Sequence, residues 1–148
     1  MLSLLGARAD SAAVVVYAVV VAEDVPLTDI TMDELRRVFL MKRAFWKPGK
    51  PIRLVLPASG LPGRRFLFEY VCQKTEGEMR RLVLESMYKG ESDQPPKVAG
   101  SDEEALRLVS AIENAVALVS TGTPRGPGLK ALRVDGKLPS DPGYPLSQ

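Results

Sequence analysis

The sequence contains no histidine and a single cysteine, so it lacks the side chains on which many enzymes and metal sites depend. Histidine is the usual general base and the commonest metal ligand, and its absence argues against hydrolytic triads and most zinc sites. Cys72 has no partner for an internal disulfide, and its apolar neighbours predict a buried position in a helix. No pairing of a nucleophile with a base is evident. We therefore expect no enzyme, no catalytic residue, no metal and no cofactor.

An excess of charge of one sign is also missing. The 20 Lys and Arg residues nearly balance the 18 Asp and Glu residues, which gives a formal net charge of +2, and the basic residues are spread along the chain. This pattern argues against nucleic acid as a partner. The longest apolar run near the N-terminus, residues 12–22, is about half the length that a membrane span needs. With 148 residues, of which 45% are hydrophobic, the chain is predicted to form one globular domain with a good-sized core.

The first nine residues resemble the end of a signal peptide. Leu2–Ala9 is apolar and small, and Ala7 and Ala9 have the small-x-small spacing of a cleavage site, so that Asp10 would begin the mature chain. Since no basic segment precedes this stretch, we interpret Met1 as a misassigned start within a longer precursor. The alternative is the unprocessed N-terminus of a cytoplasmic protein. We accordingly predict a signal-peptide remnant at 1–9, a single domain at 10–148, and export to the periplasm.

Apolar runs and helical patterns alternate along the rest of the chain. Strands are predicted at 14–21, 52–56, 115–120 and 129–134, and helices at 31–41, 64–74, 77–89 and 102–112. Thr31 with Glu34, and Ser101 with Glu104, have the spacing of capping boxes. The β-branched run Val14–Val21 is typical of a central parallel strand that is covered on both faces. The alternation predicts an α/β domain of three layers with a mostly parallel sheet.

Ligands of such sheets bind beyond the carboxyl ends of the strands, which here are 23–24, 57–63 and 120–126. The loop at 57–65 is the best candidate for an anion. Ser59 offers a hydroxyl, Gly60 and Gly63 permit close backbone approach, and Arg64 or Arg65 could clamp an oxyanion. Against this, Pro62 at the expected helix start removes one N–H donor. The alternative interpretation is a plain helix entry with two solvated arginines.

The second candidate loop follows the strand at 115–120. Ser120 and Thr121 carry hydroxyls, and Arg125 adds a positive charge, so these residues could complete an oxyanion site. A loop without ligand is the favoured alternative here. Elsewhere, Phe45 and Trp46 among basic residues form either a contact surface or, as we favour, a tryptophan that closes one end of the core. The tail from Lys137 contains three prolines, Pro139, Pro142 and Pro145, and is predicted to lie extended along the surface.

The order of these motifs resembles the phosphate-type periplasmic solute-binding proteins of ABC transporters. In that family a helix, a Lys and a Trp precede a strand and a Ser- and Gly-rich phosphate loop. The matching positions of this sequence are Leu35, Val38, Phe39, Lys42, Trp46 and the loop 58–64. Met41 replaces the glycine of the family pattern, and Asn114–Val119 keeps the apolar character of a later Gly-rich stretch without its glycines. The closing residues 135–136 and 142–146 also look like the end of that family.

The resemblance implies one lobe of a class II periplasmic binding protein, whose full members trap ligand between two lobes. The leading hypothesis is a non-enzymatic, exported module of an ABC transport or envelope system. It would bind phosphate or another oxyanion through Ser59, Gly60, Gly63 and Arg64, with Ser120 and Thr121 second. A membrane transporter or envelope protein is the implied partner, and a homodimer is one way to rebuild a cleft. The alternative is an adaptor that makes protein contacts and has lost solute binding.

Overall fold

The computed structural model describes residues 14–89 and 94–148. The twelve elements of this part follow in chain order: β1 (Tyr17–Ala22), β2 (Asp29–Ile30), α2 (Met32–Phe39), β3 (Arg53–Pro57), α3 (Pro62–Arg65), η2 (Phe66–Val71), α4 (Glu76–Tyr88), β4 (Lys97–Ala99), α5 (Asp102–Ala111), β5 (Ala115–Ser120), β6 (Leu129–Ala131) and β7 (Arg133–Val134). The predicted signal-peptide remnant at 1–9 lies outside the described residues. None of the helices in the described part is long and apolar enough to cross a membrane.

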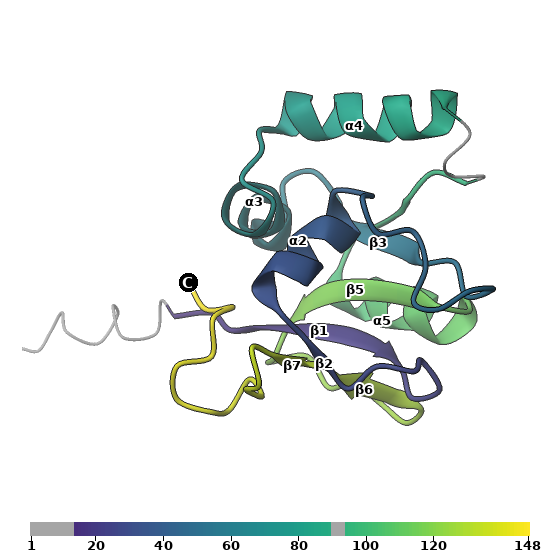
Figure 1. Cartoon of the computed structure of the whole chain (residues 1–148). Coiled ribbons are helices and arrows are strands. Elements are labelled where there is room, and N and C mark those ends of the chain that lie inside the picture. Colours follow the sequence, from purple (N-terminus) through teal and green to yellow (C-terminus); the bar gives the residue numbers. More distant parts are fainter. Residues whose placement is uncertain (1–13, 90–93) are drawn as a thin grey trace, which may run out of the picture.

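The main sheet has five strands in the order β4-β3-β5-β1-β6 (Figure 1). β3 pairs in parallel with both β4 and β5, whereas β1 pairs antiparallel with both β5 and β6. Four strands therefore share one direction, which confirms the mostly parallel sheet. The expectation that the run at 14–21 forms a parallel strand is wrong. Burial on both faces gives such a run the same apolar composition in either direction, so composition cannot reveal how the strand is oriented.

Helices cover both faces of this sheet, which confirms the three-layer α/β architecture. Alternate residues of β1 point to opposite faces. Val19 and Val21 pack in a core with residues of α2 and η2, and Ala18 and Val20 pack in a second core with α5. Figure 1 shows α2, α3 and α4 on one side of the sheet. The smaller side chains of β1 and β5 lie on the α5 side, which allows this single helix to approach the strands closely.

Local capping signals fixed the helix starts as predicted. The Thr31 hydroxyl accepts a hydrogen bond from the Glu34 N–H, and the Glu34 carboxylate accepts one from the Thr31 N–H. Ser101 likewise caps α5 by accepting from the Glu104 N–H, but the Glu104 carboxylate accepts from Gly100 instead of Ser101. The predicted capping box at Ser101 is therefore only half formed. The second complete box in the described residues, Thr75 with Glu78, begins α4 and was not predicted.

The α4 helix is the least buried element of its face. Met79 and Ser86 are its buried residues. Leu84, Met87 and Tyr88 are exposed, with Tyr88 at 95%. Figure 1 shows α4 as an outlying layer beyond α2 and α3. The apolar spacing was correct for a helix, but it did not reveal how far this helix lies from the sheet.

The C-terminal tail does not lie on the surface as predicted. Tyr144 and Leu146 are buried, at 6% and 0% exposure. The Tyr144 hydroxyl donates to the Tyr17 carbonyl oxygen at 2.6 Å, and the Tyr17 N–H donates to the Leu146 carbonyl oxygen at 2.9 Å. The tail therefore covers the beginning of β1. Burial also raises the pKa of the Tyr144 hydroxyl.

Two predictions about single core residues are confirmed. Trp46 is 5% exposed, and its indole N–H donates to the Asn114 carbonyl oxygen, so this side chain closes the core. Its neighbour Phe45 is half exposed. Cys72 is buried, and burial raises the pKa of its thiol to about 12, which leaves it unreactive at neutral pH.

Candidate functional site

The carboxyl edge of β3 and β5 gathers the two predicted loops. Because β3 and β5 are parallel, Pro57 and Ser120 end at the same edge of the sheet. The antiparallel register places Tyr17, the first residue of β1, opposite Ser120. Ala22 ends β1 at the other edge, so the acidic residues 23–24 do not belong to this site. Residues 23–24 were expected at this site because the strand that precedes them, β1, was predicted to be parallel to β3 and β5.

The loop at 58–61 presents donors that the fold leaves unused. Ser59 and Gly60 are exposed, and Gly60 has a φ of +92°, a conformation that favours glycine. The Ala58 N–H donates to Ala99, and the Leu61 N–H donates back to Ala58. Within the described part of the chain, no acceptor bonds to the N–H groups of Ser59 and Gly60 or to the Ser59 hydroxyl. These donors lie just before the helical segment that Pro62 begins.

Arg64 is bonded within the chain. Its guanidinium donates to the Glu76 carboxylate at 2.8 and 2.6 Å and to the Pro57 carbonyl oxygen at 2.7 Å. The same group lies 4.7 Å from the centre of the Phe68 ring. The hydrogen bond from Arg64 lowers the pKa of the Glu76 carboxyl below its ordinary value. Arg64 thus ties the end of β3 to the start of α4, and an oxyanion clamp at this residue stays a prediction that would compete with Glu76.

An acidic side chain occupies the second loop. The Asp102 carboxylate accepts hydrogen bonds from the Ser120 N–H at 3.1 Å and from the Thr123 hydroxyl at 3.3 Å. Asp102 is the first residue of α5, where an acidic side chain is favoured by the helix dipole. The hydroxyls of Ser120 and Thr121 have no partner in the described residues. The carboxylate therefore takes up donors that a bound anion would otherwise use.

Tyr17 belongs to this edge and was not among the predicted site residues. It is 3% exposed and its ring stacks on Phe66, with ring centres 4.5 Å apart. Burial, and secondly the charge of Asp102, raise the pKa of its hydroxyl. A Cβ atom added to Gly63 would lie 3.5 Å from this ring, an ordinary contact distance. The absence of a side chain at Gly63 thus leaves space beside Tyr17. No sequence motif marks Tyr17, because only the antiparallel pairing of β1 brings it here.

The described residues contain no group of three or more Asp, Glu or Cys side chains that could hold a metal ion. The carboxylates near the edge, Glu76 and Asp102, are each bonded to other parts of the chain. The chemistry available at this edge is thus hydrogen-bond donation from backbone N–H groups and hydroxyls, together with the exposed Arg125, which has no partner among the described residues. Such donors suit a small anion or a carbonyl oxygen.

Comparison with solved structures identifies the fold. A phosphate ABC transporter substrate-binding protein from Clostridium perfringens, solved with bound phosphate, superposes with a TM-score of 0.73 at 19% identity over 99% of this chain. An ABC-type phosphate transport receptor from Vibrio cholerae gives 0.69 at 21% identity over 90% of the chain. The chain has the fold of the phosphate-transport binding proteins. PstS from Borrelia burgdorferi gives 0.73 at 16% identity over 92% of the chain.

This phosphate-binding-protein fold covers only part of each neighbour. The chain spans 60%, 54% and 55% of the lengths of these three structures. No family model and no curated protein matches the sequence. The predicted resemblance is therefore confirmed at the level of the fold, as one α/β lobe. At 16–21% identity, the likeness shows the fold alone.

Proposed function

We propose that the chain is a non-enzymatic, exported solute-binding module whose loop at Ser59 and Gly60 binds a small oxyanion such as phosphate. The observation that carries this proposal is the set of unused donors in that loop, at the carboxyl edge of the sheet. One neighbour with this fold was solved with phosphate bound. The neighbours' names also support an ABC transporter or another envelope protein as the partner.

Each predicted residue has a defined role in this proposal. The Ser59 and Gly60 N–H groups and the Ser59 hydroxyl donate to the anion, and Gly63 leaves room for its approach beside Tyr17. Arg64 acts by holding the loop through the Pro57 carbonyl oxygen. The hydroxyls of Ser120 and Thr121 add donors from the facing loop, while the charge of Asp102 opposes the anion.

We expect the affinity of this lobe for phosphate to be low, with a Kd of about 1 mM. Water has free access to an open loop, and screening weakens every charge interaction there. A second lobe, or a second copy of the chain, would exclude this water and raise the affinity.

Isothermal titration calorimetry with phosphate, and with sulfate for comparison, tests the proposal. Ser59→Ala should weaken phosphate binding about fivefold by removing one hydrogen bond, and Asp102→Asn should strengthen it about two- to fivefold by removing a like charge. Ser140→Ala, a serine in the tail, is the matched control and should change nothing. Absence of saturable heat at about 10 mM phosphate, or equal binding by the wild type and Ser59→Ala, would refute the proposal.

The expected homodimer has one observation in its favour. Leu84, Met87 and Tyr88 are exposed together near the end of α4, although large apolar side chains usually gain from burial. Under this second proposal α4 contacts a second copy of the chain. Light scattering should then show a doubled mass that Leu84→Glu returns to the monomer, with Arg81→Glu, on the same helix, as the control. A monomer at every concentration would reject this second proposal.

A further inference from the structure

A cavity of about 300 Å³ opens at the opposite, amino edge of the sheet. Its walls come from the connection between α2 and β3, the start of β3, the side of α4, the residues just before β4 and the end of α5. The volume lies at the lower end of the range for small-molecule sites. The cavity lies beyond the first residues of β3 and β4, whereas the Ser59 loop follows the last residue of β3.

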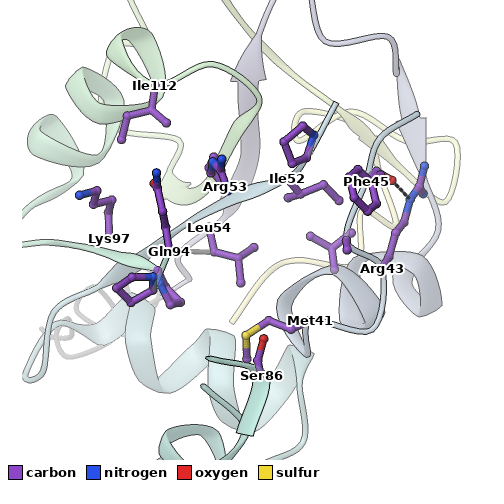
Figure 2. Close-up of a pocket in the computed structure, with 15 residues that line it drawn as sticks. Met41, Arg43, Phe45, Ile52, Arg53, Leu54, Ser86, Gln94, Lys97 and Ile112 are labelled. Atoms are coloured by element: carbon purple, nitrogen blue, oxygen red, sulfur yellow. Dashed lines mark hydrogen bonds between the residues drawn. The ribbon is translucent and has the colours of Figure 1, made fainter. Parts of the chain in front are cut away.

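The walls of the cavity are mostly apolar, and basic side chains line part of them. Met41, Ile52, Leu54 and Ile112 contribute aliphatic surface, and three prolines contribute rings without N–H donors. Arg43, Arg53 and Lys97 supply positive charge, and none of the described residues that line the cavity is acidic. Figure 2 shows Lys97 at one side of the view and Arg53 nearer its middle, with Gln94 between them and Phe45 and Arg43 at the other side.

Two of these cations have no partner among residues 14–89 and 94–148. Arg43 is bonded to its own loop through the Phe45 and Trp46 carbonyl oxygens and lies 3.6 Å from Glu34. In contrast, neither the Arg53 guanidinium nor the Lys97 ammonium has an ion pair or a side-chain hydrogen bond with any described residue. Arg53 is also half-buried, so its charge is not fully solvated. An unpaired cation at an apolar wall favours an anion beside it.

Ser86 adds a polar group to the apolar wall. It is 5% exposed, on the inner side of α4, and lines the cavity. No buried side-chain polar atom of the described residues lacks a hydrogen-bond partner, and no described residue bonds to the Ser86 hydroxyl, so this oxygen is accessible from the cavity to water or a ligand. A smaller adjoining hollow of about 170 Å³ shares Met41 and Ser86 and adds Glu85 and Lys89, of opposite charges.

We infer that this cavity binds a small aromatic carboxylate, with the carboxylate between Arg53 and Lys97 and the ring against the apolar wall. The ring would lie near the exposed Phe45 side chain and the Met41 thioether, both of which favour aromatic contacts. The Ser86 hydroxyl would hydrogen-bond a polar substituent of the ring. This site is separate from the oxyanion loop and does not depend on the function proposed for it.

Nuclear magnetic resonance titration of the ¹⁵N-labelled chain with phenylacetate tests the inference. Phenylacetate should shift the amide signals of Met41, Arg53 and Ser86 in a saturable way. 2-Phenylethanol, which keeps the ring and lacks the charge, and acetate, which lacks the ring, should each bind at least about tenfold more weakly. This comparison uses only the wild-type chain, so it does not depend on whether a variant folds.

Variants of the chain test which cations bind the carboxylate of phenylacetate. Arg53→Gln and Lys97→Gln should each raise the Kd for phenylacetate about fivefold, while Arg125→Gln, in the loop at the other edge, should leave it unchanged. Ser59→Ala should also leave it unchanged, and phosphate should not compete, which separates this site from the oxyanion loop. The inference is overturned if the alcohol binds as tightly as the acid, if Arg53→Gln and Lys97→Gln bind like the wild type, or if no saturable shift appears.

Discussion

At the carboxyl edge of the main sheet Arg64 and Asp102 are bonded within the chain, whereas at the amino edge the side chains of Arg53 and Lys97 have no partner among the described residues. Arg64 is held by Glu76 and Pro57, and Asp102 by the Ser120 loop. The difference teaches that two charged side chains at the edge where this fold is expected to bind ligand stabilise the fold instead. The donors that remain there are backbone N–H groups, hydroxyls and the exposed Arg125.

The largest effect should come from comparing one arginine at each edge. Arg64→Met removes the Glu76 pair and the bond to the Pro57 carbonyl oxygen, and should lower the free energy of unfolding by about 1–2 kcal/mol. Arg53→Met removes no such bond and should change it by less than about 0.5 kcal/mol. Urea unfolding followed by circular dichroism measures both. Equal losses in the two variants would show that the edges do not differ in this way.

The second comparison concerns the two glycines of the oxyanion loop. Gly60 has a φ of +92°, where any side chain strains the backbone, so Gly60→Ala should destabilise the chain by about 1 kcal/mol. Gly63 lies in α3 without this constraint, and its added Cβ would meet Tyr17 and Pro57 at ordinary distances. Gly63→Ala should therefore be neutral or slightly stabilising. Thermal unfolding of both variants decides this, and a larger loss for Gly63→Ala would contradict the geometry.

The smallest expected effect is the pH dependence of the Arg64–Glu76 pair. The pKa of Glu76 is lowered from 4.5, chiefly by the Arg64 hydrogen bond, so the folded state binds this proton less tightly than the unfolded state does. The stabilisation is thus complete above pH 4.5 and is lost as the pH falls through the lowered pKa. Because Glu76 is well exposed, the contribution should stay below about 1 kcal/mol.

Melting temperatures of the wild type and Glu76→Gln between pH 7 and pH 3 measure this contribution. The two curves should converge as the solution becomes acidic. In an Arg64→Met background the Glu76→Gln change should have no pH-dependent effect, because the partner is gone. A difference that persists unchanged at pH 3 would mean that Glu76 acts through something other than its charge.

Much of the fold was predictable because its signals are local. Apolar runs placed β1, β3 and β5 of the main sheet, and the N-cap residues Thr31 and Ser101 were identified from a spacing of three residues. The resemblance to phosphate-type binding proteins was also confirmed as a likeness of fold. The direction of β1 was not predictable, since a strand that is buried on both faces has the same composition in either direction. The burial of Tyr144 and Leu146 was missed because prolines and polar residues surround them.

The candidate site was predictable only in part. Ser59 and Gly60 were found from a loop between a strand and a helix, and both are exposed there. The bond between Arg64 and Glu76 joins residues 12 apart, and the bond from Ser120 to Asp102 joins residues 18 apart. No local pattern marks such pairs. The cavity at the amino edge is harder still to predict, because four separate segments of the chain supply its walls.

The sequence by itself determined the long strands and the helices, the starts of α2 and α5, and that Cys72 and Trp46 are buried. These properties follow from residue type and short-range spacing, which act before distant segments meet. Only the tertiary structure decided the direction of β1, the pairing of Arg64 and Asp102 inside the chain, and the unpaired cations beside the cavity. A side chain's charge is the same in every context, but its partners depend on which segments the fold brings within hydrogen-bond distance.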